Sequence, residues 1–190
     1  MSRRGPWVGR RGRRAGLGAA LVLSLLVAAC RRGGEEVKPE TTQPPVGPTE
    51  QATVSLLFPG PDGKLHAESR ELAVPLGADA RVAAVVAALL AGPKTEGLVA
   101  PLPAGVTVGD AFVDADGIAY LDLAAKDQPV PPPAGSDLEL LRVYSLVDTV
   151  IANEPRARSV VLLWNGVQRP TFSGHVDTAA PLLEDRTWIK

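Results

Sequence analysis

The stretch DARVAAVVAALLAGP, residues 79–93, decides the fold because it is the clearest amphipathic helix in the chain. Its large apolar side chains recur at helical spacing: Val82, Val85, Val86, Leu89 and Leu90. This spacing places them on one face, which must be buried against another element. We expect Asp79 to cap the start of the helix, and Gly92 followed by Pro93 to end it.

Two strands are predicted before this helix. Val54, Leu56 and Phe58 fall on one face of the first predicted strand, and a second strand is expected over residues 65–74, where Pro75 ends it. The Pro and Gly residues at positions 59–63 are typical of a turn. The helix is therefore expected to pack against a sheet that begins with these strands.

Two more strands are expected after the helix, over residues 106–113 and 118–123. Asp116 and Gly117 lie between them, and an Asp-Gly pair between alternating apolar residues is a strong signal of a tight hairpin.

A second helix begins at Ser136, which together with Glu139 has the spacing of a capping box. Its expected apolar face consists of Leu140, Tyr144, Val147 and Ile151. Pro155 limits the helix, residues 160–164 form a continuous apolar run typical of a central strand, and Asn165-Gly166 is a turn signal. The order strand, strand, helix, strand, strand, helix, strand predicts an α+β domain, with one mixed or antiparallel sheet and two helices on one face.

The N-terminal residues predict export and attachment to a lipid. Residues 1–14 hold six arginines and no acid, and residues 15–29 form an uncharged run, shorter than the roughly 20 residues of a spanning helix. This run ends in LVAAC, residues 26–30, which resembles the bacterial lipobox. The resemblance implies cleavage of the signal peptide 1–29, acyl chains such as palmitate on Cys30, and an anchor on the extracytoplasmic face of the cell membrane.

Two other interpretations of these residues have less support. Cys30 could be an incidental small residue at the end of a signal peptide, but it is the only cysteine in the chain. The arginine pairs could indicate twin-arginine export, but no complete motif surrounds them.

The mature chain divides into a linker and a domain. Residues 30–51 are rich in proline and contain only two large apolar residues, Val37 and Val46, so we expect a disordered spacer. Residues 52–190 have the length of one domain. All 21 acids but only 14 of the 20 bases follow Ala29, so the mature formal charge is −7 (14 − 21). This charge argues against nucleic acid and against an anionic membrane surface as electrostatic partners.

Four motifs in this order resemble the GerMN domain, also called Germane. They are ESREL (68–72), LLAGP (89–93), DGIAYLDL (116–123) and GHVD (174–177) followed by Pro181. The family occurs in sporulation and spore-germination proteins and in envelope lipoproteins, and its fold resembles the ring-building modules of secretion systems. The resemblance implies a non-catalytic interaction or scaffold domain in an envelope assembly, without a cofactor, whose partner is an envelope protein or a further copy in self-assembly.

No pattern in the sequence indicates a metal site. DADG at residues 114–117 could begin a calcium loop, but the twelfth position, which needs a bidentate Glu, is Ala125. The hairpin interpretation of this segment is therefore favoured. His66 and His175 are distant in sequence, and neither has a second histidine nearby to complete a site.

No catalytic site is expected either, so we predict that the protein is not an enzyme. Ser173, His175 and Asp177 lie within one short segment. A catalytic triad instead needs side chains that converge in space and are held in a defined geometry. A turn or a paired strand explains this segment better. No glycine motif for phosphate binding is present.

The candidate interaction surface is Trp164 with Asn165, because Trp164 ends an apolar strand beside a turn and could keep one ring face exposed. Trp188 is expected to pack in the core or at an edge. The main hypothesis is a membrane-anchored envelope scaffold or interaction lipoprotein. The alternative is a binding module for a small molecule or a cell-wall fragment, which a well-formed apolar pocket with converging polar groups would favour; a hydrolase ranks third.

The lipobox generates the first prediction. Replacing the thiol in Cys30→Ser removes the lipid attachment point, so membrane association should be lost while the domain stays folded. Fractionation of cells that express the wild type and the variant measures this. A processed Cys30→Ser protein that stays in the membrane fraction at the wild-type level would contradict the lipoprotein interpretation.

Overall fold

The computed structural model describes residues 47–190; the signal peptide, Cys30 and most of the predicted linker lie outside this range. The elements are β1 (Thr49–Pro59), β2 (Leu65–Pro75), α1 (Ala78–Leu90), β3 (Thr107–Val113), β4 (Ile118–Ala124), α2 (Ser136–Asn153), β5 (Ser159–Trp164), β6 (Val167–Gln168) and the short 3-10 helix η1 (Arg186–Trp188). The α+β class and the predicted order of the main elements are confirmed.

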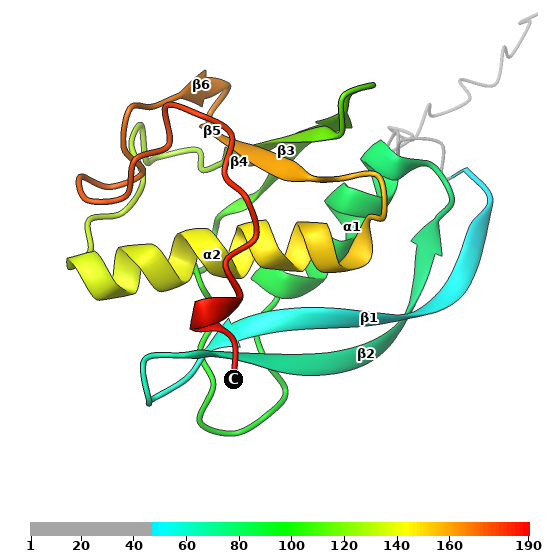
Figure 1. The fold of residues 1–190 in the computed structure, drawn as a ribbon, viewed down its shortest axis with the longest axis horizontal. Helices are drawn as coiled ribbons and strands as arrows, with labels where there is room; N and C mark the ends of the chain where they lie inside the picture. Colours follow the sequence, from blue (N-terminus) through cyan, green and yellow to red (C-terminus); the bar gives the residue numbers. More distant parts are fainter. Residues whose placement is uncertain (1–46) are drawn as a thin grey trace, which may run out of the picture. The chain divides into compact units, whose positions relative to one another are not determined.

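The strands are divided between two sheets rather than gathered in one. β1 and β2 form an antiparallel pair, and the second sheet has the order β3-β4-β5-β6. In this second sheet β4 and β5 are parallel, whereas the β3–β4 and β5–β6 pairs are antiparallel. α1 and α2 both contact β1 on one side and a strand of the second sheet on the other. Figure 1 shows α2 between the β1–β2 hairpin and the second sheet.

β1 begins earlier than expected. Thr49, Glu50 and Gln51 were placed in the linker, but they belong to the strand, because Thr49 pairs with Pro75 and Gln51 with Ala73. All three side chains are exposed, so no apolar pattern marks this part of the strand. The backbone pairing alone extends it.

α1 carries the predicted apolar face. Val82, Val85, Val86 and Leu89 are buried, and Leu90 is partly buried against the same core. Gly92 ends the helix as predicted: its φ is +90° and its N–H donates to Leu89 O.

The predicted cap at Asp79 is wrong. Gly77 is the N-cap, and the Asp79 carboxylate accepts a hydrogen bond of 2.8 Å from the Val113 N–H of β3. The carboxylate reaches β3 because α1 packs directly against that strand.

α2 differs from its prediction because it is buried from two sides. The N-cap is Gly135, and Glu139 bonds to a distant loop instead of completing a capping box with Ser136. Of the predicted apolar face only Val147 is fully buried; Leu140, Tyr144 and Ile151 are partly exposed. The buried set extends further round the helix and includes Leu141, Val143, Ser145, Leu146, Asp148, Thr149 and Val150.

Three polar side chains of α2 close the free edge of β1. Ser145 Oγ donates to Leu57 O (2.5 Å), and Thr149 Oγ1 accepts from Leu57 N–H (3.0 Å). Asn153 accepts from Ser55 N–H (2.9 Å) and donates to Ser55 O (2.7 Å). The three residues are spaced at i, i+4 and i+8, so they lie on one face of the helix. They satisfy backbone groups that would otherwise be buried unpaired, at a cost of about 1 to 3 kcal/mol each.

The predicted turns are present. Gly117 has a φ of +81° in the β3–β4 hairpin, and Asn165 and Gly166 have φ values of +50° and +78° between β5 and β6. Positive φ at both central residues is typical of a type I′ hairpin turn. Gly117 is also needed sterically, since a Cβ there would lie 2.7 Å from Arg156 O.

The apolar face of α1 generates the second prediction. Leu89 is fully buried, so Leu89→Ala should destabilise the domain by about 2 to 5 kcal/mol through lost burial and a residual cavity. Urea unfolding of a soluble form that lacks residues 1–30 measures this. The matched control is Leu183→Ala, because Leu183 is 68% exposed and its loss should cost no more than about 0.5 kcal/mol. Equal effects of the two substitutions would show that the helix face is misassigned.

Candidate functional site

Two of the family-like motifs meet at the end of α1. Arg70 donates to Gly92 O (2.6 Å) and, through Nε, to Glu68 Oε1 (2.6 Å). Glu68 in turn accepts from the N–H groups of Lys94 and Thr95 (2.9 and 2.8 Å). Burial alone would raise the pKa of Glu68, but the hydrogen bonds from Thr95, Arg70 and Lys94 lower it to about 2. The Glu68–Arg70 pair therefore fixes the loop after α1, and both charged groups are hydrogen-bonded within the domain.

A second carboxylate holds the GHVD motif. Glu139 is fully buried, and it accepts from the N–H groups of Ser173 (2.7 Å), His175 (3.1 Å) and Val176 (2.9 Å). His175 Nδ1 lies 2.8 Å from Glu139 Oε2. Burial alone would raise the pKa of Glu139, but these hydrogen bonds outweigh it and hold the pKa below its ordinary value. Ser173 Oγ donates to Pro132 O instead of His175, so the segment forms a clamped turn without a nucleophile and base.

The remaining sequence candidates have structural roles. Asp114 Oδ1 accepts from the N–H groups of Asp116 (2.9 Å) and Ile118 (2.8 Å), which fixes the hairpin turn. His66 Nε2 lies 2.8 Å from Asp62 Oδ1. Within residues 47–190 no cluster of His, Cys, Asp and Glu has the arrangement of a metal site.

The expectation of an exposed Trp164 ring is wrong. Trp164 is 1% exposed, and its Nε1 donates to Gln128 O (2.7 Å). Its ring packs edge-on against Phe172, with centroids 6.1 Å apart. It is buried because alternation along β5 directs it to the helix side of the sheet. Asn165 is exposed and bonds to the backbone of Ala125 and Gln128.

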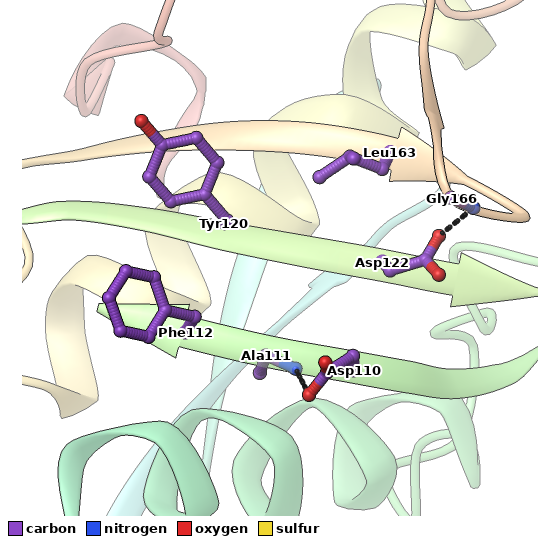
Figure 2. A pocket seen from close by; sticks show the side chains of 7 residues that line it. All are labelled: Asp110, Ala111, Phe112, Tyr120, Asp122, Leu163 and Gly166. Carbon is purple, nitrogen blue, oxygen red and sulfur yellow. Dashed lines mark hydrogen bonds between the residues drawn. The ribbon is translucent and has the colours of Figure 1, made fainter. Parts of the chain in front are cut away.

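The face of the second sheet that points away from the helices is the candidate site. Phe112 of β3 is 53% exposed, and its ring centroid lies 6.2 Å from that of Tyr120 on β4. Figure 2 shows the two rings side by side across β3 and β4, and Leu163 of β5 on the side of Asp122, with which it is in register. These side chains form part of a shallow hollow of ≈ 230 Å³.

Two carboxylates lie at the other end of this hollow (Figure 2). Asp110 and Asp122 face each other directly across β3 and β4. Asp122 Oδ1 accepts from Gly166 N–H, and Asp110 Oδ1 from Ala111 N–H, both at 2.8 Å. Neither carboxylate forms an ion pair within the described part of the chain. Like charges directly opposite each other are unfavourable, so this pair would be stabilised by a cation.

Sequence reasoning missed these residues although a signal was present. In residues 110–113 and 119–122, small or aliphatic residues alternate with Asp110, Phe112, Tyr120 and Asp122. Alternation assigns these four to one face, opposite the core. Aromatic residues on a face that no other element within residues 47–190 covers indicate a contact surface.

Asp148 of α2 is a buried ionisable group outside this face. It is fully buried; one oxygen accepts from Asp185 N–H (3.1 Å), and Oδ2 has no hydrogen-bond partner within residues 47–190. Burial raises the pKa of Asp148 to about 6, although the Asp185 N–H opposes the shift. Because the carboxyl is sealed from solvent, it affects stability rather than chemistry at a surface.

Residues 48–169 match the family model named Germane, which is described as "Sporulation and spore germination". No curated protein is similar to the chain at a significant level. Neither helix in the range 47–190 is long and apolar enough to span a bilayer.

Three solved structures share the fold. A candidate lipoprotein from Clostridium perfringens has 17% identity and a TM-score of 0.51, covering 74% of this chain and 91% of that chain. The first GerMN domain of the sporulation protein GerM from Bacillus subtilis has 18% identity and a TM-score of 0.54, covering 71% and 98%. The tandem GerMN domains of the same protein give 19% identity and a TM-score of 0.53, covering 73% of this chain and 48% of that chain.

The raised pKa of Asp148 generates the third prediction. A folded pKa of about 6 against an ordinary value of 3.8 means that the contribution of Asp148 to stability is present below pH 3.8 and is lost as pH rises through 6. Asp148→Asn removes this loss. The variant should therefore gain roughly 1 to 3 kcal/mol relative to the wild type between pH 4 and pH 7. Urea unfolding at both pH values measures the difference, and a constant difference would contradict the raised pKa.

Proposed function

The chain belongs to the Germane (GerMN) family, and we propose that it is a membrane-anchored envelope lipoprotein whose domain docks a partner protein and catalyses no reaction. The lipobox at residues 26–30 supports the anchor. The Clostridium perfringens neighbour is itself described as a candidate lipoprotein, which agrees with this assignment.

The uncovered face of the second sheet is the observation that carries the proposal. Helices cover the other face, whereas Phe112 is 53% exposed beside Tyr120 and Leu163. Aromatic side chains carry much of the binding energy at protein interfaces, because they bury a large rigid area. A flat sheet face with these side chains is suited to a protein surface.

The charge of this face defines the chemistry of the partner. Asp110 and Asp122 lie beside the aromatic rings, and neither forms an ion pair with a residue in the range 47–190. The mature chain carries a net charge of −7 (14 − 21). A partner that places an Arg or Lys next to an apolar side chain would satisfy the carboxylates and cover the rings.

The shape of the hollow beside Phe112 and Tyr120 disfavours a small molecule or cell-wall fragment as the ligand of this sheet face. Its volume of ≈ 230 Å³ is below the roughly 300 to 1,000 Å³ of typical ligand pockets. Its two carboxylates also share one sign, while polar fragments of the cell wall need donors and acceptors that converge on them.

Hydrogen bonds in the family-like motifs and in the residues that contact them support a non-catalytic role. Glu68 and Glu139 are used by backbone N–H groups, and the Ser173 hydroxyl is used by Pro132 O. We therefore expect no turnover of cell-wall or peptide substrates by the protein. Hydrolysis that is lost in Ser173→Ala would contradict this expectation.

The docking face is tested by photo-crosslinking in the native membrane. The full chain carries p-benzoylphenylalanine in place of Phe112, and it should capture one envelope protein whose contact segment contains Arg or Lys. Asp110→Asn with Asp122→Asn should reduce capture roughly tenfold, because both charge contacts are lost.

The matched controls use exposed residues elsewhere. The same crosslinker at Leu183, which is 68% exposed, should not capture this protein, and Asp116→Asn should leave capture at Phe112 unchanged. Equal capture from both positions would overturn the proposal. Binding of a purified cell-wall fragment that is lost in Tyr120→Ala would replace it with the alternative.

A further inference from the structure

Side chains occupy one edge strand in each of the two sheets. Ser145, Thr149 and Asn153 close the edge of β1, as described above. On β3, the outward Val113 N–H donates to Asp79 and the Ala111 N–H to Asp110. Side chains therefore occupy backbone groups at the edges of both sheets, a common device against unwanted pairing of strands.

β2 has a long stretch without such protection. Ser69 is paired with Ser55 of β1, and Ala67 with Leu57. The N–H groups of these two β1 residues point away from β2 and donate to side chains of α2. In an antiparallel pair, residues at such positions both direct their backbone groups outward. Within residues 47–190, no hydrogen bond involves the backbone of Ala67, Ser69 or Glu71.

The stretch is accessible and its outward side chains are small. Ala67, Ser69 and Ala73 are exposed, and Glu71 accepts a hydrogen bond from Thr53 of β1. Among the described residues, the tail of the chain hydrogen-bonds to the backbone of this strand at its first residue, where Lys190 N–H donates to Leu65 O (2.9 Å). No proline, lysine or bulge interrupts residues 67–73. The edge is therefore open to another strand.

We propose that a second copy of this chain pairs with this edge, so that two β2 strands run antiparallel about a two-fold axis at Ser69. Ser69 then faces Ser69 of the other copy, and Ala67 faces Glu71. All of these residues direct their backbone groups outward. The Ser69 pair and the two equivalent Ala67–Glu71 pairs would each form two hydrogen bonds, about six in total. The two hairpins join into one continuous four-stranded sheet.

The outward backbone groups and Glu71 select this register. The axis must lie at a residue whose backbone groups point outward. An axis at Glu71 would place two like charges directly opposite each other, which is unfavourable. An axis at Ala67 would pair Ser69 with Leu65, whose carbonyl already accepts from the chain terminus, and an axis at Ala73 would pair Glu71 with a proline that has no N–H. The axis at Ser69 avoids all three conflicts.

The linker of the same chain is a poorer occupant of this edge. Pro39, Pro44 and Pro45 have no N–H groups to donate to β2. A second copy on the same membrane would instead be present at high effective concentration, which can hold together a contact that is weak in dilute solution. This contact is separate from the docking face at Phe112, so either can fail alone.

Cysteine crosslinking of the full chain in its native membrane tests the register. Ser69→Cys should form a dimer with a short bis-methanethiosulfonate reagent, because the paired Cα atoms would lie about 5.5 Å apart. Ala67→Cys should crosslink about tenfold less, since its two copies would be about 13 Å apart. Co-expression of Ala67→Cys and Glu71→Cys should restore the dimer, and the chain without an added cysteine controls for Cys30.

Proline variants of the Ser69→Cys chain test the backbone contact. Ala67→Pro removes an outward N–H inside the paired stretch and should abolish the dimer; Ala73→Pro removes one outside it and should not. A thermal melt of each variant checks folding, and the cysteine comparison stands even if Ala67→Pro fails to fold. Equal crosslinking of Ser69→Cys and Ala67→Cys, or capture of a different protein at Ser69, would overturn the proposal.

Discussion

The burial of α2 between two sheets is the constraint on which the rest of the structure depends. Most of the surface of a helix in this position is buried, so a polar side chain on its buried faces is costly unless it finds a hydrogen-bond partner. Ser145, Thr149 and Asn153 find theirs on the edge of β1. Glu139 finds its partners in the loop after β6. The same helix therefore joins the hairpin and the C-terminal loops to one core.

Carboxylates that accept backbone N–H groups recur throughout the domain. Asp79 joins α1 to β3, Glu68 holds the loop after α1, and Asp114 fixes the β3–β4 turn. Charge-assisted hydrogen bonds of this kind are about twice as strong as neutral ones, and they give irregular segments a defined conformation. These carboxylates therefore fix the ends of helices, strands and turns to one another.

The exposed features divide into two surfaces with different physical character. The face around Phe112 and Tyr120 offers apolar area beside two carboxylates, which suits a side chain of opposite charge. The edge of β2 offers backbone donors and acceptors with small side chains, which suits another strand. A domain with both surfaces could bind a partner while it assembles with its own copies at the membrane.

The sequence by itself determined the elements and most of their ends. Helical spacing in α1, the glycine at position 92 and the Asp-Gly and Asn-Gly turns act over a few residues, so they can be recognised locally. Tertiary structure decided what lies far apart in the chain: the division into two sheets, the burial of Trp164, and the partners of Asp79 and Glu139. An acid at the start of a helix has the same local pattern whether it caps that helix or bonds to a distant strand. Only the packing of the elements brings the distant strand within hydrogen-bonding reach of the carboxylate.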